Sequence, residues 1–153
     1  MKKVKKIAIA LSVFFISSLL LNHYMSYSMK IGHTGFYLVE TMATSDDGKP
    51  LLALCYKDMT GGYKSVEMSG FPKQIFWNEE YLISKNYDGN APTIVSYVII
   101  KIDSINVSDG DISEQYVLDT KTKYNRFIQK RGLSEAKMTQ MDNRTLWWEL
   151  LFK

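Results

Sequence analysis

The chain has 153 residues, of which 19 are basic, 16 are acidic and one is a cysteine. This length fits one domain with a short N-terminal segment, and a lone cysteine excludes an intramolecular disulfide. The basic pI of about 8.8 comes from the N-terminus. Four of the basic residues are Lys2, Lys3, Lys5 and Lys6, so residues 29–153 carry 15 basic and 16 acidic side chains. The charge gives no argument for nucleic-acid binding, and we expect no nucleic-acid partner.

The four lysines precede residues 7–21, an uncharged and mainly apolar run, and this order is typical of an export signal. A membrane-spanning helix needs about 20 apolar residues, and the best cleavage motif, Ser26-Tyr27-Ser28, is poor. An uncleaved transmembrane helix and a cleaved signal peptide therefore both stay open, with the anchor favoured. The apolar side chains of that membrane anchor are Ile7, Phe14, Phe15, Leu19, Leu20 and Leu21.

The lysines should stay in the cytoplasm while the rest of the chain is exported, because basic residues flank membrane segments on the cytoplasmic side. We divide the chain into residues 1–28, a signal peptide or membrane anchor, and residues 29–153, an exported β-rich domain with a C-terminal helical segment. The expected location is the cell envelope, with the domain tethered in the periplasm or at the cell surface, or secreted after cleavage.

The region from residue 29 to residue 118 reads as β-structure, with short strands separated by turns rich in Asp, Asn, Gly and Pro. Residues 51–57 are apolar on both alternating faces, which indicates a central strand covered on both sides. Residues 93–103 form the longest β-run and are the best candidate for the centre of a sheet. The expected strands are 35–42, 51–57, 63–68, 74–78, 81–87, 93–103 and 114–118.

Three residues of these strands are predicted to lie in the core. Cys55 lies among leucines, where a thiol behaves as a small apolar group, and Tyr97 lies in the longest strand. Trp77 shares a face with Ile75 in period-2 register and precedes Asn78-Glu79-Glu80, the expected bend of a hairpin. We therefore expect Trp77 to be largely buried and the two acids to be in water.

The period changes after residue 119, and residues 121–131 are predicted to form a helix. Asp119 or Thr120 can cap its start, and Gly132 occupies the position that commonly ends a helix. A second short helix is expected over residues 135–141, with Ser134 as its cap. If residues 145–153 form a strand, Trp147 and Trp148 point to opposite faces, and the exposed one is a candidate interface residue.

The predicted fold class is α+β and mainly β. An N-terminal hydrophobic helix is followed by an antiparallel β-meander that bends into a sandwich or a partly open barrel. One or two C-terminal helices pack at one edge of it.

No residue pattern predicts catalysis, a metal site or a cofactor. His33 is the one histidine outside the N-terminal segment, and a pair with Cys55 is disfavoured because reactive thiols need a polar, partly exposed setting. The chain has no Gly-x-Ser-x-Gly elbow, no Cys/His zinc spacing and no glycine-rich phosphate loop. Asp109-Gly110-Asp111 is favoured as a turn over a calcium loop. We therefore predict a protein that is not an enzyme.

Three motifs carry a resemblance. They are Gly61-Gly62-Tyr63 with Val66, the pattern I-x-W-N-x-x-Y-L-I at 75–83, and Tyr116 to Asp119 with Thr122. Across residues 35–133 the chain resembles a loose group of small, exported, uncharacterised bacterial β-rich proteins. The resemblance implies a β-rich fold and carries no known activity.

Small size, export and the lack of a catalytic set favour a non-enzymatic envelope protein that binds another protein, with an immunity-type protein as one concrete form. Its partners would be the membrane, through the N-terminal helix, and an unidentified protein. The alternative is a domain that binds a glycan or a lipid through its aromatic residues. A small hydrolase ranks third, and it requires His33 or a pair of acids to line the main pocket.

Overall fold

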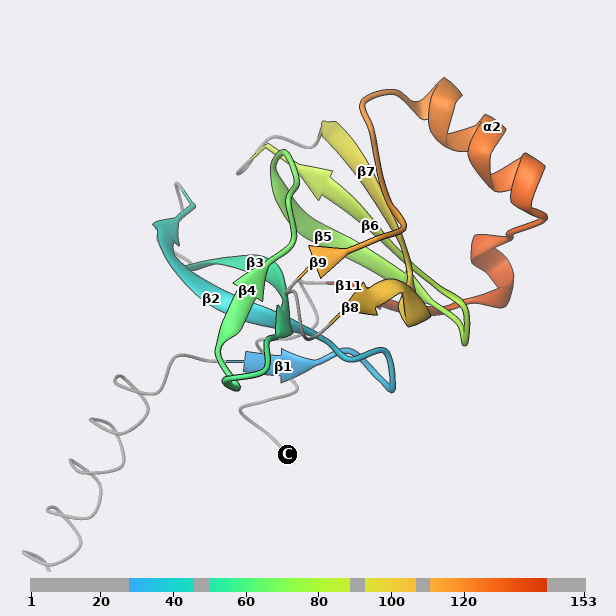
Figure 1. Cartoon of the computed structure of the whole chain (residues 1–153). Helices are drawn as coiled ribbons and strands as arrows, with labels where there is room; N and C mark the ends of the chain where they lie inside the picture. Colours follow the sequence, from blue (N-terminus) through green and yellow to red (C-terminus); the bar gives the residue numbers. More distant parts are fainter. Residues whose placement is uncertain (1–27, 46–49, 89–92, 107–110, 143–153) are drawn as a thin grey trace, which may run out of the picture.

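Two antiparallel β-sheets share one core in the computed structural model, which describes residues 28–45, 50–88, 93–106 and 111–142 (Figure 1). The first sheet has the order β1-β2-β3-β4 and is a simple meander. Its strands are β1 at Ser28–Lys30, β2 at Phe36–Thr44, β3 at Pro50–Lys57 and β4 at Tyr63–Ser65.

The second sheet has five strands in the order β10-β7-β6-β5-β11, and all its pairs are antiparallel. A short pair, β8 at Ile105–Asn106 and β9 at Asp111–Ile112, lies between β7 and β10 in the sequence. The five strands are β5 at Phe71–Trp77, β6 at Tyr81–Tyr87, β7 at Ile94–Lys101, β10 at Gln115–Leu118 and β11 at Thr139–Asp142.

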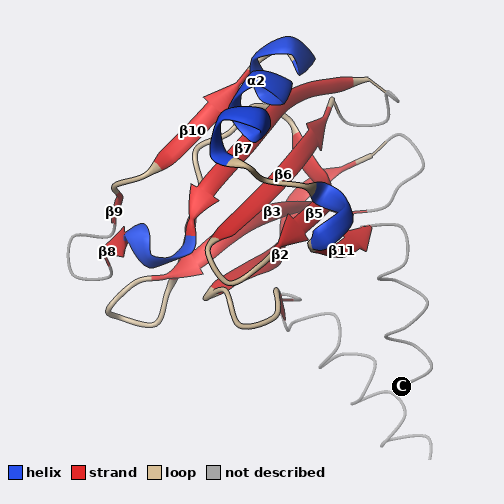
Figure 2. Cartoon of the chain, turned by 90° about the vertical axis from the view of Figure 1, so that its right-hand side faces the viewer, coloured by secondary structure: helices blue, strands red, loops and turns tan. Residues whose placement is uncertain are grey.

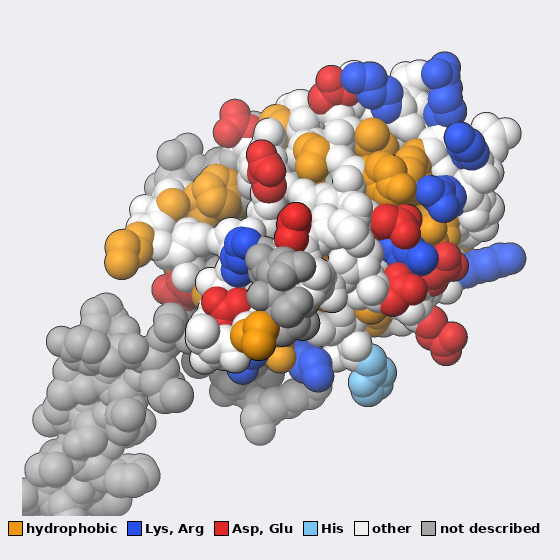
Figure 3. Space-filling view, viewed as in Figure 1, with side chains coloured by type: hydrophobic (Ala, Val, Ile, Leu, Met, Phe, Trp, Pro, Cys, Tyr) orange, Lys and Arg blue, Asp and Glu red, His pale blue; other side chains and the backbone are white. Residues whose placement is uncertain are grey.

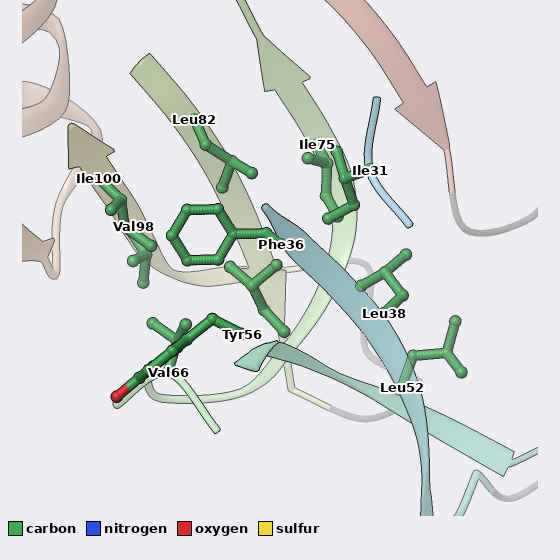
Figure 4. Packing of buried hydrophobic residues seen from close by; sticks show 11 residues of the cluster. Ile31, Phe36, Leu38, Leu52, Tyr56, Val66, Ile75, Leu82, Val98 and Ile100 are labelled. Atoms are coloured by element: carbon green, nitrogen blue, oxygen red, sulfur yellow. The ribbon is translucent and has the colours of Figure 1, made fainter. Parts of the chain in front are cut away.

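The inner faces of the two sheets form an apolar core. Phe36, Leu38 and Leu54 come from the first sheet, and Ile75, Leu82, Val98 and Ile100 come from the second. In Figure 4 the ring of Phe36 points toward the side chains of the opposite sheet. Alternation along each strand explains this arrangement, because every second side chain points to the same face.

Helix α2 at Lys121–Arg131 covers the outer face of the five-stranded sheet, as Figure 2 shows. Thr120 caps its start by accepting a hydrogen bond from the Lys123 amide, and Gly132 ends it in the left-handed conformation at φ +64°. Tyr124 is the buried side chain of the helix, and its ring stacks on Tyr97 of β7 with centroids 4.3 Å apart. The helix over residues 121–131 is therefore confirmed, together with its cap and its end.

The fold prediction is wrong in its helical parts, although the mainly-β character agrees with the structure. Among the described residues α2 is the one α-helix, and none of their helices is long and apolar enough to cross a membrane. The predicted N-terminal hydrophobic helix falls on residues 1–27, which lie outside the described residues. The helical material also covers a face of a sheet and not its edge.

The predicted second helix over 135–141 is also wrong. Only Glu135–Lys137 forms a single 3₁₀ turn, η2, and the chain then enters β11. The reason is tertiary: Thr139–Asp142 pairs with the exposed edge of β5 along Gln74–Trp77. Leu133 and Met138, on either side of this turn, pack against the cluster beneath α2. The strand hydrogen bonds outweigh the local helix signal.

Candidate ligand-binding cavity

A cavity of about 430 Å³ lies at one end of the core between the two sheets. Segments far apart in the sequence build it: the β1–β2 loop, the end of β5 with the following turn, the 3₁₀ turn η1 at Ile102–Ser104, and η2 with the start of β11. The lining residues are His33, Thr34, Trp77, Asn78, Glu79, Ile102, Lys137 and Thr139.

Trp77 forms the apolar floor of this cavity. It is the last residue of β5, pairs with Leu82 on one side and Thr139 on the other, and packs against the inner core while remaining half-buried. Trp77 thus packs against the core as the sequence predicts. Part of its side chain stays exposed because β5 ends at this residue.

Gly32 in the β1–β2 loop lets the backbone approach the indole. Its φ is +49°, and a Cβ placed on it would lie 2.5 Å from Nε1 of Trp77. A side chain at this position would be strained by the left-handed backbone and would also collide with the ring. A glycine is therefore required at position 32 by the nearby indole. The sequence alone does not show that Trp77 is the residue that comes close to it.

The turn that follows Trp77 is held by its own hydrogen bonds. Oδ1 of Asn78 accepts from the amides of Glu80 at 2.9 Å and Tyr81 at 2.7 Å, and the Asn78 amide donates to the Tyr81 carbonyl at 3.0 Å. The turn therefore presents Glu79 beside Trp77 at the same cavity. Glu79 and Glu80 are both exposed, as expected for the two acids, and Glu79 also lines the cavity beside Trp77.

The opposite wall is equally fixed. Thr34 is buried, and its hydroxyl donates to the Ile31 carbonyl at 2.7 Å and accepts from the Phe36 amide at 3.2 Å. The Ile102 amide donates to the Glu80 carbonyl at 2.8 Å, which ties η1 to the hairpin turn. These bonds involve backbone groups on both walls, so the cavity is preformed.

Several polar side chains of the cavity wall form no hydrogen bond or ion pair with other described residues. Within the described residues, no hydrogen bond or ion pair engages the side chains of His33, Glu79 and Lys137 or the indole N–H of Trp77. Asn78 uses its carbonyl oxygen in the turn and keeps its amide donors. The cavity therefore offers several donors and one carboxylate around an aromatic surface.

Two predicted core residues lie elsewhere. Cys55 is 3% exposed, its Sγ lies 3.7 Å from Oγ of Ser65, and burial raises the pKa of its thiol. Tyr97 is 4% exposed beneath α2 and its pKa is raised, first by burial. Neither lines the cavity.

The remaining predicted site residues lie outside the described residues. They are the interface candidates Trp147 and Trp148 and the anchor residues Ile7, Phe14, Phe15, Leu19, Leu20 and Leu21.

His33 lines this cavity, as the hydrolase hypothesis requires of the pocket that would hold a substrate. However, Glu79 is the one carboxylate among the described lining residues, and glycoside hydrolysis in most enzymes uses two. The described residues also contain no group of three or more side chains suited to hold a metal ion. The arrangement is suited to holding a polar ligand.

Sequence reasoning missed four lining residues: Thr34, Ile102, Lys137 and Thr139. Lys137 and Thr139 reach the cavity because β11 pairs with β5, which places Thr139 beside Trp77. Comparisons of the chain with protein-family models, with curated proteins and with solved structures find no match. The resemblance to small exported β-rich proteins therefore stays a prediction.

Proposed function

We propose that the domain is a non-enzymatic binding module that holds a small carbohydrate in the cavity at Trp77. The observation that carries this proposal is a half-buried indole surrounded by side chains with unused hydrogen-bonding groups. Sugars present both an apolar ring face and a circle of hydroxyls. An aromatic surface covers the first, and fixed polar groups match the second.

The composition of the wall favours a carbohydrate over a lipid. Apart from Trp77 and Ile102 the lining residues are polar or charged. An acyl chain would offer these polar groups no hydrogen-bonding partner and would displace water from them. A sugar replaces the water on the same groups with hydroxyls, so little hydrogen bonding is lost.

Isothermal titration calorimetry of the full-length chain tests the proposal. The protein is kept in a detergent without a sugar headgroup, and D-glucose, D-galactose and their uronates are titrated into it. We expect saturable binding of at least one of them, and we expect Trp77→Leu to abolish it. Tyr63→Leu is the matched control, because Tyr63 is a partly exposed aromatic residue on β4 that does not line the cavity.

Binding that survives Trp77→Leu, or the absence of binding for all four sugars, would contradict the proposal. Circular dichroism of each variant shows whether a loss of binding reflects a loss of fold.

A protein partner is the second candidate, and the β3–β4 hairpin favours it. Met59 at its turn is 70% exposed and Tyr63 is 40% exposed. The ammonium of Lys57 lies 5.3 Å from the ring centre of Tyr37 and 5.4 Å from that of Tyr63. In Figure 3, exposed hydrophobic side chains lie in several separate groups on this face and not in one broad patch. An immunity-type protein would bind its toxin through such a hairpin.

A pull-down from envelope extracts separates the two candidates. A specific protein that is retained by the native chain and lost with Met59→Glu supports a protein partner on the hairpin. Repeated failure to recover one removes this candidate.

We propose an exported location on the strength of the N-terminal sequence. The four lysines and the apolar run at residues 7–21 support export of the domain, tethered to the membrane or released from it. Protease should digest the domain when it is added to cells whose outer membrane is permeabilised and whose inner membrane is intact. Protection until the cells are lysed would place it in the cytoplasm instead.

A further inference from the structure

The cavity wall carries one cation and one carboxylate, and most of its remaining polar groups are hydrogen-bond donors. Lys137 contributes a cation, and His33, the Trp77 indole and the Asn78 amide contribute donors, against the single carboxylate of Glu79. A neutral sugar would use the donors and Glu79 but would leave the ammonium of Lys137 without an anionic partner.

The neighbouring carboxylate does not neutralise Lys137. Glu135 lies in the same 3₁₀ turn, η2, but its Oε2 is 2.7 Å from Nζ of Lys85, and its Oε1 accepts from the hydroxyl of Tyr124. Both oxygens are therefore committed on the far side of the turn, beneath α2. The Lys137 amide donates to the Ser134 carbonyl at 3.0 Å, so the backbone beneath Lys137 is held in place.

We propose that the ligand of this cavity is an acidic sugar, a pyranose that carries a carboxylate. The inference rests on the proposed function and narrows it. The sugar ring lies against Trp77, its hydroxyls pair with Glu79 and the amide of Asn78, and its carboxylate lies at Lys137 and His33. Each of the unused polar groups then has a partner of matching chemistry.

The gain from the carboxylate is limited because Lys137 is exposed. Water and salt screen a charge pair at the surface. We therefore expect the uronate to bind up to about five-fold more tightly than the neutral sugar, the range that exposed ion pairs reach. The advantage should fall as sodium chloride is raised from 20 to about 500 mM, because the Debye length shortens from about 20 Å to about 4 Å and salt then screens the exposed pair more strongly.

The experiment compares D-glucuronate with D-glucose, D-galacturonate with D-galactose, and acetate alone, by calorimetry on the full-length chain. Lys137→Gln should lower the affinity for a uronate several times more than it lowers the affinity for the neutral parent sugar. Lys130→Gln is the matched control, since Lys130 is an exposed lysine near the end of α2 that does not line the cavity.

The outcomes are distinguishable from those of the proposed function. Equal affinity for the uronate and the neutral sugar would overturn the acidic sugar while the carbohydrate site stands. Binding of acetate as tight as that of a uronate would overturn both, because the sugar ring would then contribute nothing. An equal loss of both sugars in Lys137→Gln would overturn the role given to Lys137.

Discussion

The two ends of the core between the sheets differ in the hydrogen bonding of their polar side chains. At one end, which we call the closed end, the buried side chains of Ser84, Asn86 and Ser96 bond to one another. The hydroxyl of Ser84 donates to Oδ1 of Asn86 at 2.6 Å, Nδ2 of Asn86 donates to Ser96 at 3.0 Å, and Ser96 donates to the carbonyl of Ser69 at 2.6 Å. At the other end, the open end, the polar groups around Trp77 face a cavity.

Both ends lie on the inner face of the same sheet, so the difference is one of hydrogen bonding and not of strand pattern. A bonded network inside the protein stabilises the fold, because every buried group has a partner. Unused groups at a cavity are available to a ligand. Substitutions at the closed end should therefore change stability, and substitutions at the open end should mainly change binding.

The substitution with the largest expected effect on stability is at Gly70, and Gly32 offers a matching glycine at the open end. Gly70 at the closed end has φ +77°, and a Cβ on it would lie 2.6 Å from the Tyr87 carbonyl oxygen and 2.7 Å from a methyl of Val95. The collision is with backbone, so the end of β6 must move. We expect Gly70→Ala to cost about 3 kcal/mol, from a left-handed penalty and overpacking, as measured by urea unfolding. A cost below about 1 kcal/mol would show that the closed end yields easily.

Asn86→Ala should have the next largest effect on the free energy of unfolding. It removes the acceptor of Ser84 and the donor to Ser96 in a fully buried position. We expect a loss of about 2 kcal/mol in the free energy of unfolding, the cost of leaving buried polar groups unpaired. Sugar affinity should stay unchanged in calorimetry, because the site is at the other end. If Asn86→Ala kept its stability but bound sugar more weakly, the closed end would serve binding and not stability, which contradicts the comparison.

Gly32→Ala is the counterpart at the open end. The group in the way is the indole of Trp77, a side chain at the edge of a cavity, so it has room to shift. We expect a cost of about 1.5 kcal/mol, mostly from the left-handed backbone, together with a clear loss of ligand affinity. Unfolding and calorimetry on the same sample measure both. If Gly32→Ala destabilised as much as Gly70→Ala, the open end would be as rigidly packed as the closed end.

Much of the fold is predictable because its signals are local. Alternation places Phe36 and Leu38 in the core, and the cap at Thr120 with Gly132 defines α2. The cavity is not predictable in this way, since its walls come from segments that meet only when both sheets form. The same cause explains β11, where an available strand edge overrides the local preference of residues 135–141.

The smallest expected change in stability comes from a polar cluster on the outer face of the five-stranded sheet. There Tyr124, Glu135 and Lys85 form a third polar cluster that is internally bonded like the closed end. Burial, followed by the bond to Glu135, raises the pKa of Tyr124 well above its ordinary value of 10.0. The stabilisation is therefore complete below pH 10 and is lost as the pH rises further, because the unfolded chain releases the proton that the folded chain retains.

Tyr124→Phe removes that hydrogen bond, and we expect it to cost about 1 kcal/mol at pH 8. The difference in unfolding free energy between the native chain and Tyr124→Phe should shrink between pH 10 and pH 11. A difference that is constant over this range would mean that the Tyr124 pKa is not raised by the fold.

The central claim is that the open end holds a ligand and the closed end does not, and one NMR titration tests it directly. The indole N–H of Trp77, assigned with Trp77→Phe, and the side-chain amide of Asn86 report on the two ends of the same core. On addition of D-glucuronate we expect the Trp77 signal to shift saturably and the Asn86 signal to stay in place. Equal shifts at both ends, or no shift at Trp77, would contradict the account.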